Sequence, residues 1–387
     1  MQFSSRLGLF GNEVFAALNE KRRELEAQGR RIYDLSVGTP DFRPPAHVVE
    51  ALKASADDPN SWKYSLHDKD ELLQAVCDYY ERRYGVGGIT PDMVCSCHGS
   101  QEGMGHLGMV LLDPGDVALI PDPCYPAFAT GVLLGGGTPA YYPLDAEHDF
   151  LPCMDQIDPE VADAAKYILV SLPANPVGSI ARPGLYEEII AFAKEHDLLV
   201  VHDNAYSDIV YEGEGRCGSF LAVPGALDVG VEFFSLSKSF DVTGARLSFL
   251  VGRPDVVGAF RKLRSQIDFG MFYPEQDAAI AALTGPLDSV VEQGKRYRER
   301  RDALCDGLAA AGWDRPSAHG SMFVWCRMPH GRKDSQEFVL DLMDKAGVIV
   351  TPGASFGPHG EGYVRMALVL PPEQLREACE AIAASGL

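Results

Sequence analysis

The chain has 387 residues, of which 46% are hydrophobic and 23% charged, which is the composition of an ordinary globular protein. This length is enough for two or three domains with a substantial core. The formal net charge of −21 argues against nucleic acid or an anionic membrane surface as a partner, and it leaves the identity of a small-molecule ligand open.

The first part of the chain predicts alternating helices and strands. Asn12 is the expected N-cap of a helix that runs to about Gln28 and ends before Gly29. An extended segment at residues 32–35 leads into the turn-rich run 36–41. Beyond it, short apolar segments read as buried strands at residues 94–97, 117–120, 167–172, 198–201, 231–236 and 247–251.

Helical patterns lie between several of these strands, most clearly at residues 100–112 and 183–196, whereas glycines 135–137 are interpreted as a loop. Short strands that are apolar along most of their length, alternating with helices, predict a mostly parallel sheet covered on both faces. The sequence therefore indicates an α/β architecture for this part of the chain.

The pattern changes after about residue 285. A long charged amphipathic stretch covers residues 287–311 and is followed by the run 321–328. A helix is expected near residues 337–346, strands near Val348 and Tyr363, and a last helix from Pro372. This α+β texture predicts a second, smaller domain.

The cysteines and the hydropathy of the sequence indicate the cellular compartment of the protein. Nine cysteines are scattered without a repeated spacing, so reduced thiols in the cytoplasm are expected. Cys95, Cys97 and His98 are close enough to suggest a metal site, but no second cluster completes four ligands, and a buried strand explains the cysteines better. No metal is expected. No apolar run approaches about 18 residues, so neither a membrane span nor a signal peptide is expected.

Lys238 is the most informative residue. It lies in the run Ser235-Leu236-Ser237-Lys238, directly after the apolar residues 231–234. An amine at the end of a buried strand loses hydration, which lowers its pKa and makes it nucleophilic. Eight residues later, Arg246 offers a planar guanidinium suited to an anion. A nucleophilic lysine beside an anion-binding arginine is what a pyridoxal 5'-phosphate (PLP) Schiff base requires.

Other polar residues follow strands of the predicted sheet, where parallel α/β proteins place their ligands. Ser100 and Gln101 open a helix whose free backbone amides would hold a phosphate. Asp203 follows residues 198–201, where a buried carboxylate would pair with a pyridinium N–H or else cap the next turn. Asn175 would donate to the phenolic oxygen of the cofactor or start a turn.

The order of these motifs strongly resembles that of the fold-type I, class I/II PLP-dependent aminotransferases, over about residues 36–365. The matching motifs are Gly99-Ser100-Gln101, Pro123-Cys124-Tyr125-Pro126, Asn175-Pro176-Val177-Gly178, Asp203-Asn204-Ala205-Tyr206, Ser235-Leu236-Ser237-Lys238 and Arg246. The resemblance implies a large PLP-binding domain, residues 42–285, with a mostly parallel seven-stranded sheet between helices. A smaller α+β domain would combine residues 1–41 and 286–387.

The resemblance also implies a role for each matching residue. Lys238 would form the Schiff base with PLP and then move the Cα proton of the substrate. Asp203 would keep the pyridine nitrogen protonated. Tyr206 and Asn175 would hydrogen-bond the phenolic oxygen, and Tyr125 would stack on the ring. The phosphate would be bound by Ser100, Gln101, Ser235, Ser237 and Arg246.

Three more matches concern the substrate and a partner chain. Arg365 would bind the substrate's α-carboxylate, and Gly38 lies in the loop that closes over it. Tyr64 would reach the phosphate of a second subunit, which implies a homodimer with shared active sites. The family's usual glycine and arginine after this tyrosine are Lys69 and Gln74 here, so the geometry of this loop is expected to differ.

The implied reaction is ping-pong transfer of an amino group between an L-amino acid and a 2-oxo acid. Residues 265–272, with Gln276 and residues 278–283, look most like the LL-diaminopimelate aminotransferase branch. Branches that act on alanine, aspartate or aromatic amino acids share much of this pattern and remain alternatives. A PLP-dependent C–S β-lyase is a further alternative, although the ending Gly244-Ala245-Arg246 favours transamination.

Two further functions have only weak support in the sequence. Gly353-Ala354-Ser355-Phe356-Gly357 matches the Gly-x-Ser-x-Gly elbow of serine hydrolases, but Pro358 follows where an elbow would open a helix, and no aspartate occurs after Ser355. A non-catalytic PLP-fold regulator would not require the proton-shuttling amine of Lys238.

Overall fold

The apolar segments between residues 94 and 252 pair into one sheet. A computed structural model describes residues 1–10, 13–211, 213 and 217–387, so the expected N-cap Asn12 lies outside the described residues. The seven strands have the order β2-β8-β7-β6-β5-β3-β4. They are β2 (Val94–His98), β3 (Val117–Asp122), β4 (Thr138–Pro143), β5 (Ala165–Ser171), β6 (Leu199–Asn204), β7 (Gly230–Ser235) and β8 (Leu247–Gly252).

The mostly parallel sheet is confirmed. Only β8 runs antiparallel to its neighbours, β2 and β7. The six predicted strands are present with ends shifted by a few residues, whereas β4 was not predicted. Its prolines, Pro139 and Pro143, obscure a strand pattern in the sequence, and they are tolerated because β4 lies at an edge of the sheet.

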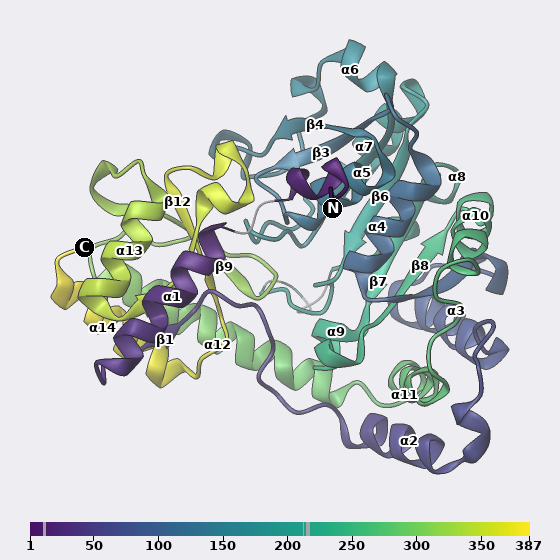
Figure 1. The fold of residues 1–387 in the computed structure, drawn as a ribbon, viewed down its shortest axis with the longest axis horizontal. Coiled ribbons are helices and arrows are strands. Elements are labelled where there is room, and N and C mark those ends of the chain that lie inside the picture. The colour runs from purple at the N-terminus through teal and green to yellow at the C-terminus, as the bar shows by residue number, and fades with distance from the viewer. Residues whose placement is uncertain (11–12, 212, 214–216) are drawn as a thin grey trace.

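Helices cover both faces of this sheet (Figure 1). Along β6, Val200 belongs to one buried apolar cluster and Val201 to another, because successive strand residues point to opposite faces. The helices in this part of the chain are α2 (Ala46–Asp57), α3 (Asp70–Tyr84), α4 (Ser100–Leu111), α5 (Ala127–Gly135), α6 (Pro159–Ala164), α7 (Leu185–Glu195), α8 (Ala226–Val229), α9 (Leu236–Ser239), α10 (Pro254–Arg264) and α11 (Tyr273–Thr284).

Helices α4 and α5 pack with their backbones in close contact. A Cβ on Gly108 would lie 2.0 Å from the carbonyl oxygen of Gly131, and one on Gly135 would lie 2.3 Å from that of Gly108. Gly135, expected in a loop, is therefore the last residue of α5, and its lack of a side chain serves helix packing.

The two ends of the chain come together in a second group of strands and helices beside the large sheet (Figure 1). Strand β1 (Tyr33–Asp34) pairs in parallel with β10 (Val348–Ile349). A three-stranded antiparallel sheet has the order β11-β12-β9, from Thr351–Pro352, Tyr363–Ala367 and Phe323–Arg327. Around them lie α1 (Glu13–Ala27), α12 (Asp288–Ala310), α13 (Ser335–Ala346) and α14 (Pro372–Ser385), and Figure 1 shows α1 beside α13. None of the described helices combines the length and apolarity needed to cross a membrane.

Candidate active site

The sheet brings the proposed site residues to one edge. Strands β5, β6 and β7 are parallel, so their carboxyl ends lie together, followed by Asn175, Tyr206 and Lys238. Strand β8 runs the other way, so its first residues lie at the same edge, and Arg246 directly precedes them. The antiparallel strand is what places Arg246 beside Lys238.

A cavity of about 550 Å³ opens at this edge. Of the residues proposed from the sequence, all but Tyr64 line it: Gly38, Ser100, Gln101, Tyr125, Asn175, Asp203, Tyr206, Ser235, Ser237, Lys238, Arg246 and Arg365. Tyr64 is 86% exposed and lies outside the cavity of its own chain.

Lys238 projects its amine into this cavity. The Nζ atom donates a hydrogen bond to the carbonyl oxygen of Gly38 at 2.7 Å. Burial lowers the pKa of Lys238 to about 8, and the positive charges of Arg365 and Arg246 act in the same direction. Near neutral pH the amine is therefore closer to its neutral, nucleophilic form than an exposed lysine is.

An anion cradle lies at the start of α4. The Oγ atom of Ser100 is buried without a hydrogen-bond partner among the described residues. Gly99 has φ +87°, and a Cβ there would lie 1.9 Å from a guanidinium nitrogen of Arg246. The guanidinium of Arg246 donates to the carbonyl oxygen of Thr243 at 2.9 Å, and no ion pair is found for it among the described residues. A phosphate group matches this set of unused donors.

Asp203 lies deep in the cavity. The residue is 5% exposed, and its carboxylate accepts one hydrogen bond among the described residues, from Ser171 Oγ at 3.3 Å. Burial raises the pKa of Asp203 to about 6, although the neighbouring His202 opposes this shift. A buried carboxylate with only one hydrogen-bond donor is suited to a ligand that donates an N–H, such as a pyridinium ring.

Arg365 occupies the other side of the cavity. It is 7% exposed and no ion pair is found for it among the described residues. It donates to Asn175 Oδ1 at 3.0 Å and to the carbonyl oxygen of Ser36 at 2.7 Å, while its Nε has no partner among the described residues. Burial lowers the pKa of Arg365 to about 10, which is the signature of a guanidinium that lacks a counter-ion.

The contact between Arg365 and Asn175 also orients the amide. Because Arg365 takes the side-chain oxygen of Asn175, the NH₂ group of that asparagine is left to donate to a ligand. Tyr125 OH donates to Gln101 Oε1 at 3.0 Å, which fixes the tyrosine ring at the cavity wall.

Sequence reasoning missed Phe323. This side chain is 2% exposed on β9, and its ring lies 4.1 Å from the guanidinium carbon of Arg365. A Cβ on Gly38 would lie 2.3 Å from the same ring, so Gly38 is required by the close approach of Phe323. The 321–328 segment carried no polar motif, and only the pairing of β9 with β12 brings Phe323 to Arg365.

The backbone of Lys69 has an ordinary extended conformation. Lys69 has φ −64° and ψ 141°, a conformation open to every residue, so a glycine is not needed there. Its backbone N donates to Gln276 Oε1 at 2.8 Å, and its Nζ contacts Asp277 at 2.6 Å. The departure from the family pattern therefore replaces glycine with a residue that ties this loop to α11.

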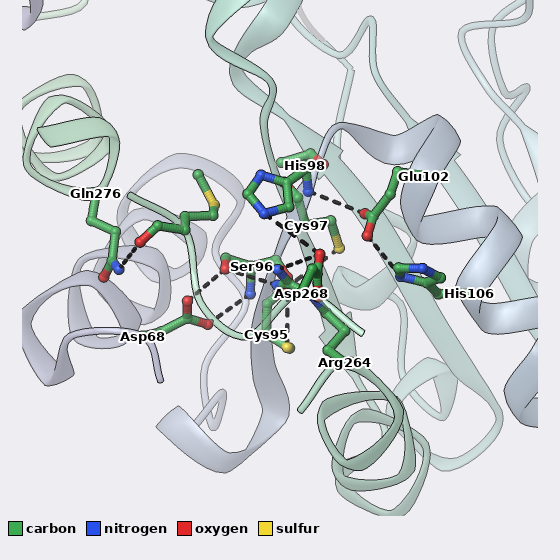
Figure 2. A network of polar contacts seen from close by, with 12 residues as sticks. Asp68, Cys95, Ser96, Cys97, His98, Glu102, His106, Arg264, Asp268 and Gln276 are labelled. Carbon is green, nitrogen blue, oxygen red and sulfur yellow. Dashed lines mark hydrogen bonds and ion pairs between the residues drawn. The ribbon is translucent and has the colours of Figure 1, made fainter. Parts of the chain in front are cut away.

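A polar network lies beside the anion cradle, at the end of β2 (Figure 2). Asp68 accepts from Ser96 N at 2.9 Å, and Arg264 contacts both Ser96 and Asp268. The ring of His98 lies 3.5 Å from Asp268. This network joins the loop after Tyr64 to the segment after α10.

The cysteines of β2 make only weak contacts with backbone carbonyl oxygens, from Cys95 Sγ to Ser96 at 3.6 Å and from Cys97 Sγ to Cys95 at 3.9 Å. Cys95 and Cys97 are buried in the apolar cluster between the sheet and α4, and burial raises the pKa of the Cys95 thiol to about 12. His98 points instead toward Asp268, so the three residues do not converge on one point (Figure 2).

The Gly-x-Ser-x-Gly run does not form a hydrolase elbow. Residues 353–356 form a short 3₁₀-helix, η9 (Gly353–Phe356), and a second one, η10 (Pro358–Gly360), follows. Ser355 Oγ is buried without a hydrogen-bond partner among the described residues, so no histidine activates it.

The comparisons with known proteins agree with this geometry. Residues 30–382 match the family model described as aminotransferase class I and II. A protein from Moorella thermoacetica named LL-diaminopimelate aminotransferase is 40% identical over 383 residues, which are 98% of this chain and 97% of that protein.

Two solved structures share the fold over nearly the whole chain. Apo BacF from Bacillus subtilis has a TM-score of 0.95 and 33% identity, covering 100% of this chain and 99% of its own. A probable N-succinyldiaminopimelate aminotransferase from Thermus thermophilus has a TM-score of 0.89 and 35% identity, covering 96% and 100%. The chain therefore belongs to the class I and II aminotransferases and is a PLP-dependent enzyme that transfers an amino group between an amino acid and a 2-oxo acid.

Proposed function

We propose that the amino donor is LL-diaminopimelate or a close analogue. The observation that carries this proposal is the similarity to relatives that bear this name, at 38–40% identity over 95–100% of the chain. The segment 265–272, which resembles that branch, lies on the loop after α10 and outside the cavity of its own chain.

The α-carboxylate of either substrate would bind to Arg365. This guanidinium is buried, faces the cavity and has no acidic partner among the described residues, so a carboxylate would supply the missing charge. An amino acid and its 2-oxo acid share this group, so one arginine serves both halves of the cycle.

PLP, when bound, supplies a carbonyl carbon that joins the substrate amino group and a ring that accepts electrons released at Cα. The chain's residues would direct this chemistry. Lys238 Nζ would take the Cα proton when neutral and return it later, and the carbonyl oxygen of Gly38 holds that amine at the cavity. Asp203 would accept the ring N–H, and the NH₂ of Asn175 and the hydroxyl of Tyr206 would donate to the phenolic oxygen.

The remaining polar groups would hold the phosphate. Ser100, Ser237 and Arg246 line the cavity on the side of the α4 N-terminus. Ser235 Oγ accepts from Ser237 N at 3.2 Å, so it shapes the turn that carries Lys238.

We propose two domains, with residues 42–285 as the large domain and residues 1–41 and 286–387 as the small one. All seven strands of the large sheet fall within the first range. The pairing of β1 with β10 supports a small domain that contains both ends of the chain.

We also propose a homodimer with shared sites. Trp62, Tyr64 and Leu66 are exposed, and so are Ile267 and Phe269. The two loops that carry them lie side by side, because Gly270 N donates to the carbonyl oxygen of Ser65 at 2.8 Å. A second copy would cover this apolar surface, and Tyr64 of each copy would reach the phosphate of the other.

We assign the enzyme to the cytoplasm, because all nine cysteines are free thiols.

A half-reaction panel tests the substrate. The PLP enzyme is mixed with LL-diaminopimelate, glutamate, aspartate, alanine or an aromatic amino acid, and cofactor absorbance is followed in each case. We expect the fastest conversion with LL-diaminopimelate. Conversion with the other amino acids but none with LL-diaminopimelate would contradict the substrate and leave the reaction intact.

A further inference from the structure

The glycines of the 353–360 loop mark a crowded contact. Cβ atoms on Gly353 and Gly360 would lie 1.9 and 2.1 Å from each other's carbonyl oxygens. Gly357 has φ +128°, and a Cβ there would lie 2.0 Å from Oδ1 of Asp122. The Gly-x-Ser-x-Gly run is therefore explained by close backbone packing, and its second glycine, Gly357, admits a carboxylate from the large domain.

The carboxylate of Asp122 accepts hydrogen bonds from one residue, His359, among the described residues. Asp122 ends β3, is 2% exposed, and accepts from His359 Nδ1 at 2.7 Å and, more weakly, from His359 N at 3.3 Å. Both donors belong to the small domain. A buried carboxylate is strongly unfavourable without donors, so this contact holds the 353–360 loop against the end of β3.

The same loop reaches Arg365. Cys124 N donates to the carbonyl oxygen of Phe356 at 2.8 Å, a second link between the domains. The ring of Phe356 lies 4.7 Å from the guanidinium carbon of Arg365 and is 5% exposed. Phe356 therefore lies between the Asp122 contact and the proposed carboxylate site.

We propose that Asp122 and His359 are positioning residues for substrate binding, which fix the 353–360 loop so that Phe356 orients Arg365 toward the α-carboxylate. This inference rests on the proposed role of Arg365. Because Arg365 has no carboxylate partner among the described residues, the aromatic rings and three oxygen acceptors fix its direction.

Loss of the Asp122 contact should change the KM values for both substrates. The amino acid and the 2-oxo acid share the α-carboxylate, so weakening the Asp122 contact should raise both KM values by a similar factor. Of the proposed PLP residues, only Tyr125 follows β3, and Gln101 holds its hydroxyl separately at 3.0 Å, so cofactor affinity should change much less than the KM values. A contact that is only structural would lower the melting temperature and leave both KM values unchanged.

The variants Asp122→Ala and His359→Ala test this in the holoenzyme. We expect both KM values to rise about tenfold in Asp122→Ala, with kcat changed less than about threefold, because a desolvated cation–π contact of the arginine is loosened. His359→Ala should raise them less, since the backbone donor remains. His359→Asn, whose amide can still donate to Asp122, should restore values near those of the native enzyme.

A matched control is Asp145→Ala. Asp145 accepts from His148 Nδ1 at 2.8 Å, the same kind of contact, but unlike Asp122 it is partly exposed and, in the described part of the chain, is not linked to a residue that contacts Arg365. The KM values of the Asp145→Ala enzyme should equal those of the native enzyme. If Asp122→Ala does not fold, His359→Ala carries the test alone.

The outcomes separate the two proposals. Arg365→Lys should raise both KM values more than any of these variants. If it does not, the proposed role of Arg365 is wrong. If Arg365→Lys behaves as expected while Asp122→Ala and His359→Ala keep native KM values, only the positioning role is overturned.

Discussion

At the scale of single residues, the site depends on charges that the protein leaves uncompensated. Asp203 and Arg365 are buried and Lys238 is partly buried, and each has a pKa displaced toward its neutral form, mainly by loss of hydration. Groups held in this way interact strongly with a ligand of opposite charge, because little water screens them.

Direct labelling of the amine tests the lowered pKa of Lys238. In cofactor-free protein, acetylation by acetic anhydride should be half-maximal near pH 8, because burial, Arg365 and Arg246 all disfavour the protonated amine. Peptide mass spectrometry measures the extent of labelling, with exposed lysines of the same digest as the reference. A midpoint close to that of a free lysine, about 10.4, would contradict the assignment.

Asp203→Asn tests the cost of a buried carboxylate. A pKa raised to about 6 means that the folded protein holds this proton more tightly than the unfolded chain does, so stability falls as the pH rises from about 4 to about 6 and stays lower above that range. At pH 7.5 the cofactor-free variant should gain on the order of 3 kcal/mol in free energy of unfolding.

Urea denaturation measures this gain, and the same comparison at pH 4 should show almost none. Transamination should fall at the same time, because the amide cannot hold a ring N–H as a carboxylate does. A variant less stable than the native chain at pH 7.5 would contradict the prediction.

At the scale of elements, single side chains tie loops together. Gln276 on α11 is 0% exposed and accepts from Lys69 N. It also donates to Ser65 Oγ at 2.8 Å and to the carbonyl oxygen of Met271 at 2.7 Å. One amide thus fixes the loop of Tyr64 and the start of α11 in a single arrangement.

Gln276→Ala should lower the free energy of unfolding by about 2–3 kcal/mol, because it leaves buried polar groups without partners. Chemical denaturation checks this value. The control Gln266→Ala alters an exposed side chain and should change stability by less than about 0.5 kcal/mol. An equal effect of the two substitutions would show that the Gln276 contacts contribute nothing.

At the scale of the whole molecule, the proposed homodimer would cover the exposed apolar loops that carry Tyr64 and Ile267. Ile267→Asp combined with Phe269→Asp should give a monomer by sedimentation velocity, because two charges cannot be buried there without partners. Activity should fall with it, since Tyr64 would no longer reach a second cavity. Leu340→Asp, an exposed position on α13, is the control and should leave the sedimentation coefficient unchanged.

Much of the architecture was predictable from local pattern. The strands that lead to Ser100, Asn175 and Lys238, and the strand whose end carries Asp203, are short and mostly apolar, and the structure contains them all. Strand β4 and helix α5 were missed because prolines and glycines hide their pattern, and only edge position and helix packing permit those residues. Most cavity residues proposed from the sequence lie together because they stand at one edge of the seven-stranded sheet, whereas Gly38 and Arg365 come from the smaller sheets.

The sequence by itself determined the reaction class, because nucleophile, acid and anion-binding residues come in a fixed order along alternating strands and helices. Tertiary structure alone decided which groups lack partners and what surrounds them. The rings of Phe323 and Phe356 pack against the guanidinium of Arg365. Asp122 is hydrogen-bonded to His359, which is far from it in the chain. The physical reason is that residue types and spacing record local preference, whereas burial and desolvation arise only when distant segments pack.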